Sequence, residues 1–347
     1  MPLVRKIEEK GLTRQLIYDG ISKTFYHDNN VNLEDRSGEV NLYRYNKDGR
    51  TNEGGIESGK QTIVVIHGLN GHSEGPNIKK LLTTAAEKYE KDYQVLALDW
   101  KPLAEDGVPP WKAARAIKPV AEWGKNTLEN LGIKAEQITL FGHSLGSYVS
   151  AEIAAGLFSS GYVDGGRLGL IPTGQKQSSV NHLVALDPAY PGAEYDVDGN
   201  APGFQGITKF KDVTDRSLAF VVADSGKIDG VSGDNVVAGN NADESLVIRY
   251  NFALDRAKPG ERHSRVIDVF ADILSNNHLK LSDDLALPSD LKPNKYLDNG
   301  RRYISLNLDP TVSDVARHEG VIVANRDGTV KELWYDNGSI LEKKIWT

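Results

Sequence analysis

The stretch at residues 137–157 constrains the fold of this chain more than any other. Residues 137–141, Gln-Ile-Thr-Leu-Phe, predict a short buried strand, and the small and apolar residues at 147–157 predict a helix. Gly-His-Ser-Leu-Gly lies between them at residues 142–146. A sharp turn from strand to helix forces its central residue into a strained backbone conformation. The flanking glycines are needed there because a Cβ would collide with the neighbouring strand or helix.

The pentapeptide alone is weak evidence, because glycine makes up 34 of the 347 residues. The strand before it and the helix after it are the context that the motif requires. Ser144 would then stand at the N-terminus of a helix, where free N–H groups favour a developing negative charge. We therefore interpret Ser144 as a candidate nucleophile.

Strand and helix patterns alternate along the middle of the chain. Apolar or alternating runs predict strands at residues 38–45, 61–66, 94–98, 180–186, 217–223 and 244–252. Helical periodicity predicts helices at residues 77–89, 111–131 and 264–274, with Pro119 expected to kink or divide the second. This alternation predicts an α/β fold, with a mostly parallel sheet and helices on both faces. Ligands of such sheets bind beyond the carboxyl ends of the strands, which four polar residues follow: His67, Ser144, Asp187 and Asp224.

The character of the sequence changes near residue 285, where prolines, aspartates and asparagines indicate a linker. We expect an α/β catalytic domain over residues 1–284, with N-terminal strands and turns in residues 1–60, and a β-rich appendage over residues 285–347. Alternating patterns predict three appendage strands, at residues 320–324, 329–335 and 339–346. Asp-Gly and Asn-Gly turns between them predict a small β-meander.

Composition narrows the functional classes. An apolar content of 39% and a charged content of 26% are typical of a soluble globular protein. The net charge of −7 argues against a nucleic-acid partner, and the absence of cysteine excludes disulfides, thiolate metal sites and a cysteine nucleophile. No signal-peptide pattern and no apolar run of membrane-spanning length is visible. The compartment (cytoplasm, or secretion with the leader removed) and the oligomeric state stay open.

An activated serine needs a base and an orienting acid. In this fold the partners follow the serine in the order acid, histidine, which leaves three candidate bases: His263, His278 and His318. His263 follows a polar loop and directly precedes a predicted helix, so we expect it to be the base. The acid is Asp187 or Asp224, since each ends an apolar strand, and the residues alone do not choose between them.

The oxyanion of such a reaction needs two backbone N–H donors. Leu145 follows the serine directly and supplies one. The turn after residues 61–66 supplies the other, with Leu69 as the natural candidate. We expect His67 to hold that loop by hydrogen bonds and His143 to pack.

Four segments together resemble the pancreatic-lipase-like family, which contains triglyceride lipases and phospholipases A1. They are His-Gly-Leu at 67–69, Leu-Asp-Trp at 98–100, Gly-His-Ser-Leu-Gly at 142–146 and Leu-Asp-Pro-Ala-Tyr-Pro at 186–191. The resemblance covers residues 61–275 and implies an α/β-hydrolase fold. It also implies the site residues: Ser144 as nucleophile, Asp187 as acid, His263 as base, and Leu69 and Leu145 as oxyanion donors.

The chain departs from that family in three ways. The disulfides of the family are absent, and the short meander does not match its C-terminal β-sandwich. The family also has a calcium site after the acid strand. Asp212 and Asp215 match part of that site, but Ile207 stands where a glutamate is expected. A structural calcium on Asp212 and Asp215 is therefore an open expectation, and we expect that no cofactor is required.

The resemblance implies a serine carboxylic-ester hydrolase that acts on acylglycerol or phospholipid-like esters through an acyl-enzyme. The same triad could act on thioester, polyester or peptide substrates instead. A further alternative is a lipid-binding relative that has lost catalysis. The complete set of Ser144, Asp187 and His263 counts against that last alternative.

Overall fold

The computed structural model describes residues 5–9, 12–17, 22–27, 36–51, 55–105, 110–160, 179–189, 208–222, 238–250, 259–276, 320–324, 330–336 and 341–345. Its strands are β1 (Arg5–Glu9), β2 (Leu12–Ile17), β3 (Ser22–His27), β4 (Arg36–Asn46), β5 (Gly49–Thr51), β6 (Gln61–Ile66), β7 (Tyr93–Asp99), β8 (Ile138–His143), β9 (Val180–Leu186), β10 (Thr214–Val222), β11 (Glu244–Tyr250), β12 (Gly320–Ala324), β13 (Val330–Asp336) and β14 (Leu341–Ile345). Its α-helices are α1 (Pro76–Tyr89), α2 (Lys101–Ala104), α3 (Pro110–Asn130), α4 (Leu145–Ser160), α5 (Phe210–Val213) and α7 (Pro259–Ser275). Two short 3₁₀ helices are η1 (Ala135–Gln137) and η2 (Gly239–Asn241).

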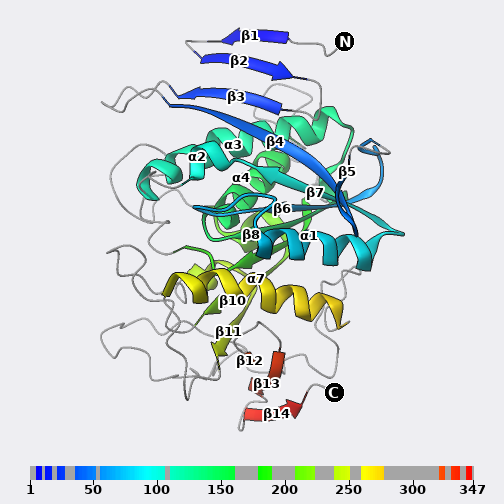
Figure 1. The fold of residues 1–347 in the computed structure, drawn as a ribbon, viewed down its shortest axis with the longest axis vertical. Helices are drawn as coiled ribbons and strands as arrows, with labels where there is room; N and C mark the ends of the chain where they lie inside the picture. The colour runs from blue at the N-terminus through cyan, green and yellow to red at the C-terminus, as the bar shows by residue number, and fades with distance from the viewer. Residues whose placement is uncertain are drawn as a thin grey trace, which may run out of the picture.

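The described strands form one sheet that runs the length of the molecule (Figure 1). Their order is β1-β2-β3-β4-β7-β6-β8-β9-β10-β11-β12-β13-β14, and β5 pairs with β4 outside this path. The strands from β7 to β12 in this order are parallel to one another, whereas β7 pairs with β4 and β12 with β13 in antiparallel fashion. The strands from β1 to β4 and from β13 to β14 pair in antiparallel fashion. A parallel centre therefore has an antiparallel extension at each end.

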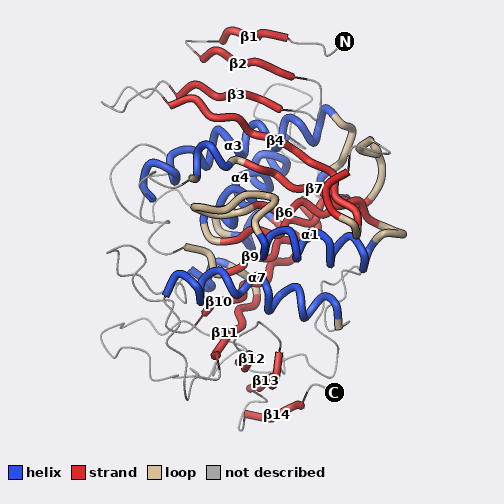
Figure 2. The backbone as a smooth tube through the Cα atoms, in the orientation of Figure 1, coloured by secondary structure: helices blue, strands red, loops and turns tan. Residues whose placement is uncertain are grey.

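Helices cover both faces of the parallel centre (Figures 1 and 2). Helices α1 and α7 pack on one face, and α3 and α4 on the other. The sequence of strand β6 is continuously apolar because both of its faces are covered. Ile63 and Val65 face α1 and α7, whereas Val64 and Ile66 face α3 and α4. Each such fully buried side chain stabilises the fold by about 1.5–3 kcal/mol.

Most elements that the sequence predicts are present, with ends shifted by a few residues. The parallel centre, the helices on both faces and the turn after β8 make this the α/β-hydrolase fold, as expected. Helix α3 contains Pro119 and continues past it as one helix, so the expected division is wrong. The apolar face of α3, including Ile117 and Val120, is buried in the core, and this packing holds the helix together across the missing hydrogen bond.

The C-terminal meander is present as β12, β13 and β14. Its first strand pairs in parallel with β11, from Leu246 opposite Gly320 to Tyr250 opposite Ala324. The meander therefore extends the central sheet, which the sequence did not predict. The domain boundary near residue 285 stays a prediction.

At the other end, β1, β2 and β3 form an antiparallel series that joins the sheet through β4. The sequence predicted strands in this region but did not place these three. Among the helices that the structure describes, none is both long and apolar enough to cross a membrane.

Candidate functional site

The predicted turn from strand to helix is present at Ser144. Strand β8 ends at His143 and helix α4 begins at Leu145, so Ser144 alone forms the turn. Its φ of 54° lies in the left-handed region, which costs about 1–3 kcal/mol for a residue with a side chain. The Ser144 N–H donates to the carbonyl of Leu186 over 2.9 Å, and only 4% of the residue is exposed. The strained conformation is thus tied to the end of strand β9.

Glycines allow the loop after β6 to lie against this turn. An ideal Cβ on Gly146 would lie 2.4 Å from the carbonyl oxygen of Ile66, and one on Gly68 would lie 2.4 Å from the Cβ of Ser144. Gly142 is equally crowded by backbone atoms of α4. Side chains at these positions would force the backbones apart. Gly68 therefore lies in direct contact with the candidate nucleophile.

The two predicted oxyanion donors lie on either side of this contact. Leu145 is the first residue of α4, and the first N–H groups of a helix have no acceptor within the helix. Leu69 follows Gly68 in a tight turn. The hydrogen bonds of that turn use the N–H of Gly71, which donates to Gly68, and the N–H of Asn70, which donates to Ala104. The N–H of Leu69 is not used by either bond.

The structure brings the predicted acid and base together. Nδ1 of His263 lies 2.5 Å from Oδ2 of Asp187, and the other carboxylate oxygen accepts the N–H of Val222 over 3.0 Å. Asp187 is fully buried, has a φ of 46° at the end of β9, and donates its own N–H to the carbonyl of Phe220. Because a carboxylate only accepts hydrogen bonds, Nδ1 of His263 carries the proton and Nε2 is left as the basic nitrogen.

His263 lies inside helix α7, not before it as the sequence predicted. The helix begins four residues earlier, at Pro259. Proline is favoured at the first helical position, and Glu261 in the first turn interacts favourably with the helix dipole. The competing candidates Asp224, His278 and His318 lie outside the described residues.

His67 holds the loop, as the sequence predicted, through a network with Asp99 and Trp100. Its Nδ1 donates to the carbonyl of Gly68 over 2.9 Å, and the indole N–H of Trp100 donates to the His67 carbonyl over 2.8 Å. Nε2 of His67 lies 3.0 Å from the Trp100 N–H and 3.2 Å from Oδ1 of Asp99. Nε2 of the neutral His67 ring accepts a hydrogen bond from the Trp100 N–H. Nε2 of a protonated ring would donate to Oδ1 of Asp99 instead.

The sequence analysis assigned no role to Asp99. The residue belongs to Leu-Asp-Trp at 98–100, one of the four segments that resemble the pancreatic-lipase-like family. Both the N–H and the hydroxyl of Ser73 donate to its Oδ2, and the N–H of Lys101 donates to its Oδ1. Burial raises the pKa of Asp99, but the hydrogen bonds and attraction from His67 and the hydrogen bonds from Ser73 outweigh burial. The net pKa of Asp99 lies below its ordinary value.

The calcium site expected at Asp212 and Asp215 stays a prediction. Both residues are exposed, and Oδ1 of Asp215 accepts the hydroxyl of Ser179 over 2.5 Å. Calcium takes six to eight oxygen ligands. Within the described part of the chain, no group of three or more histidine, aspartate or glutamate side chains could hold a metal ion. Ile207 lies outside the described residues.

Comparisons with known proteins give only distant structural likenesses. No family model and no curated protein matches this sequence. The chain is similar to the solved structure of Est1E from Butyrivibrio proteoclasticus, at 14% identity and a TM-score of 0.39, covering 73% of this chain and 96% of that one. It is also similar to an alpha-beta serine hydrolase homologue from Coxiella burnetii, at 16% identity and a TM-score of 0.36, with the same two coverages. An esterase from Pyrobaculum calidifontis follows at 15% identity and a TM-score of 0.31, covering 73% of this chain and 72% of that one. The assignment of the fold rests on the sheet and the turn described above, not on these values.

Two glycines of helix α4 test the close packing at the turn. Gly146→Ala places a Cβ against backbone oxygens, so we expect a loss of about 1–3 kcal/mol or more in the free energy of unfolding. Gly156→Ala is the matched control, because its Cβ would meet only the flexible side chain of Lys125 at 3.3 Å. There, alanine should stabilise the helix by about 0.5–1 kcal/mol. Urea unfolding measures both variants, and equal stabilities would contradict the packing.

The lowered pKa of Asp99 predicts a dependence of stability on pH. A carboxylate whose pKa is lower in the folded state stabilises the fold fully above its unfolded pKa, about 3.9, and this contribution is lost as the pH falls below that value. Asp99→Asn should therefore reduce the free energy of unfolding at pH 7 by about 1.5–3 kcal/mol, and the difference from wild type should shrink below about pH 4. The exposed Asp92→Asn is the control, expected to change stability by less than about 0.5 kcal/mol at either pH.

The calcium expectation is tested by chelation. A structural calcium on Asp212 and Asp215 would make the melting temperature fall in excess EDTA. A fall that Asp212→Asn or Asp215→Asn abolishes would establish the ion on these residues, and an unchanged melting temperature would count against it.

Proposed function

We propose that this protein is a serine carboxylic-ester hydrolase, with Ser144 as nucleophile, His263 as base and Asp187 as acid. The hydrogen bond of 2.5 Å between Nδ1 of His263 and the buried carboxylate of Asp187 is the observation that carries the proposal. It fixes the tautomer in which Nδ1 carries the proton and Nε2 can act as the base. The positive φ of Ser144 supports the same role, because strain of this kind persists only where the surroundings impose it.

The acylation step follows from these groups. Oγ of Ser144 attacks the ester carbonyl carbon while Nε2 of His263 takes its proton. The negative charge moves to the carbonyl oxygen, where the N–H groups of Leu69 and Leu145 stabilise it. The tetrahedral intermediate then collapses, the bond to the alcohol oxygen breaks, and His263 returns the proton to the leaving alcohol. An acyl group remains on Ser144.

Deacylation repeats the sequence with water. His263 takes a proton from the water molecule as its oxygen attacks the acyl carbon, and then returns the proton to Oγ of Ser144. Through both steps Asp187 stabilises the imidazolium. Burial of its carboxylate strengthens that attraction, and the N–H of Val222 satisfies its second oxygen.

Acylglycerol or phospholipid-like esters are the substrates that we propose. Support comes from the sequence resemblance to the pancreatic-lipase-like family, above all from Leu-Asp-Pro-Ala-Tyr-Pro at residues 186–191. Thioesters, polyesters and peptides would use the same catalytic groups.

A panel of p-nitrophenyl esters of increasing chain length, a phosphatidylcholine vesicle, a thioester and a peptide amide separates these classes. Preference for the thioester or the peptide would contradict the proposed substrate class.

The catalytic assignment is tested by two matched pairs of variants. Ser144→Ala should reduce kcat by about 10⁶-fold with the fold intact, whereas the exposed Ser58→Ala should leave it unchanged. Asp187→Asn should reduce kcat by about 10⁴-fold because the wrong tautomer of His263 is favoured. Asp224→Asn, at the competing position, should retain activity.

A fluorophosphonate probe measures the same assignment without a choice of ester. The probe should label wild type and the Ser58→Ala variant at Ser144, and should not label Ser144→Ala. A folded wild type that takes up no label would support the non-catalytic alternative, and loss of activity in Asp224→Asn with retention in Asp187→Asn would reverse the choice of acid.

A further inference from the structure

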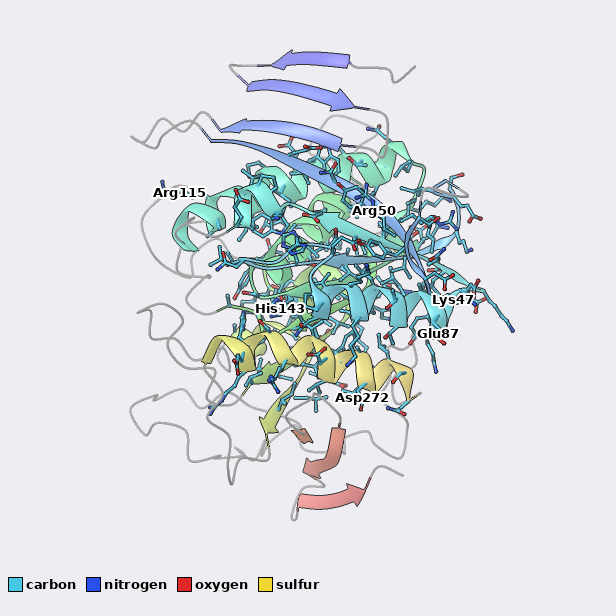
Figure 3. The ribbon with its side chains drawn as sticks, viewed as in Figure 1. Lys47, Arg50, Glu87, Arg115, His143 and Asp272 are labelled. Carbon is cyan, nitrogen blue, oxygen red and sulfur yellow. The ribbon has the colours of Figure 1, made fainter. Side chains whose placement is uncertain are left out.

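His143 connects the turn of the nucleophile to the helix of the base. It is the residue before Ser144, and only 7% of it is exposed. Its Nε2 lies 3.0 Å from the backbone carbonyl oxygen of His263, and the two imidazole rings pack with their centroids 4.6 Å apart. Figure 3 labels His143 in the interior of the molecule, beside α7. A direct contact thus joins residues that are 120 positions apart in the chain.

The chemistry of this contact fixes the protonation of His143. A carbonyl oxygen only accepts hydrogen bonds, so Nε2 of His143 carries a proton and donates a hydrogen bond to the backbone carbonyl oxygen of His263. Burial lowers the pKa of His143 well below its ordinary value, and the nearby His263 and His67 lower it further when they are charged. His143 is therefore a neutral donor, and it stays neutral when His263 becomes an imidazolium.

The next carbonyl of helix α7 is held in a similar way. Nδ2 of Asn77, at the start of α1, donates to the carbonyl of Ser264 over 3.1 Å and lies 2.9 Å from a carboxylate oxygen of Asp268. Two consecutive carbonyls of α7 thus accept side-chain N–H groups, one from the turn of the nucleophile and one from the helix packed beside α7. A carbonyl has two lone pairs, so these bonds are compatible with the helix's own hydrogen bonds.

The contacts from His143 and Asn77 hold the backbone of helix α7 at His263, whereas Asp187 holds only the imidazole ring. Asp187 orients the imidazole of His263 through Nδ1, but the distance between Nε2 and Oγ of Ser144 also depends on where the backbone of α7 lies. Because His143 is adjacent to Ser144, its bond to the His263 carbonyl relates that backbone directly to the nucleophile. A misplacement of 1 Å can reduce the rate of a reaction of this kind by about 100-fold.

We propose that His143 is a positioning residue for the hydrolytic reaction, which it serves by donating a hydrogen bond to the backbone of the base, with Asn77 as its partner on α1. The inference rests on the proposed function of Ser144 and His263. It adds a role for the side chain at the second position of Gly-His-Ser-Leu-Gly, beyond packing.

Three substitutions separate the hydrogen bond from packing. His143→Phe keeps a ring against His263 and removes the donor, His143→Leu fills the space with a different apolar shape, and His143→Gln places an amide N–H near the position of Nε2. We expect Phe and Leu to reduce kcat on p-nitrophenyl butyrate by up to about 100-fold with KM unchanged. Gln should restore activity to a level above both apolar variants.

The rate of fluorophosphonate labelling should follow kcat across the series, because labelling also requires His263 to activate Ser144. Circular dichroism and urea unfolding confirm that each variant is folded. Asn77→Leu should reduce kcat in the same sense by a smaller factor, since it leaves the bond from His143 in place. If Phe or Leu is folded and equals wild type in kcat and labelling, the positioning role is overturned.

The protonation of His143 gives a test that does not depend on activity. In ¹⁵N-labelled wild type, imidazole NMR should show one histidine that stays neutral with its proton on Nε2 between pH 5 and 8, and this signal should be missing in His143→Gln. A His143 that titrates near its ordinary pKa would overturn the contact. A wild type that hydrolyses no ester and takes up no label would instead overturn the proposed function, so the two failures are distinguishable.

Discussion

The close approach of the loop after β6 to the turn after β8 is the constraint on which the candidate site depends. Backbone oxygens of that loop leave no room for a Cβ at Gly146, and Ser144 leaves none at Gly68. Leu69 and Leu145, which we propose as the oxyanion donors, directly follow Gly68 and Ser144 at this contact. Ser144 must take a left-handed conformation to make the turn, and its hydrogen bond to Leu186 holds it there. The strain therefore serves to project one side chain from the end of a parallel strand.

Three polar side chains around this contact form hydrogen bonds with other parts of the chain. Asp187 accepts from His263 and Val222, Asp99 accepts from Ser73 and Lys101, and His143 donates to the backbone of α7. In a medium of low dielectric constant these bonds are strong, and an unpaired group would be costly. The network connects two loops and one helix to the turn of the serine, and these bonds require no substrate.

The sequence predicted those parts of the molecule that are set by local pattern. Residues 142–146 lie between a strand pattern and a helix pattern, which is the context that a strand-turn-helix motif requires. The apolar run at 61–66 is typical of a strand covered on both faces, so the turn and the parallel sheet could be foreseen. The pairing of β12 with β11 could not, because nothing in residues 320–324 encodes which strand they meet. The roles of Asp99 and His143 were missed for a similar reason, since each depends on a partner far along the chain. The start of α7 was misplaced because Pro259 and Gly260 suggested a loop, whereas proline at the first position begins the helix.

The residues that contact one another at the candidate site lie far apart in the sequence, and this separation affects when the site forms during folding. Asp187 and His263 are 76 residues apart, His143 and His263 are 120 apart, and Asn77 and Ser264 are 187 apart. Contacts of such long range form late, because the entropy of closing large loops is lost before the contacts can compensate for it. Only a segment that spans at least Asn77 to Ser264 contains Ser144, the proposed base His263 and the residues that contact them. During synthesis, more than a hundred residues would follow Ser144 before His263, the proposed base, is added to the chain. The candidate site would therefore assemble only as folding ends.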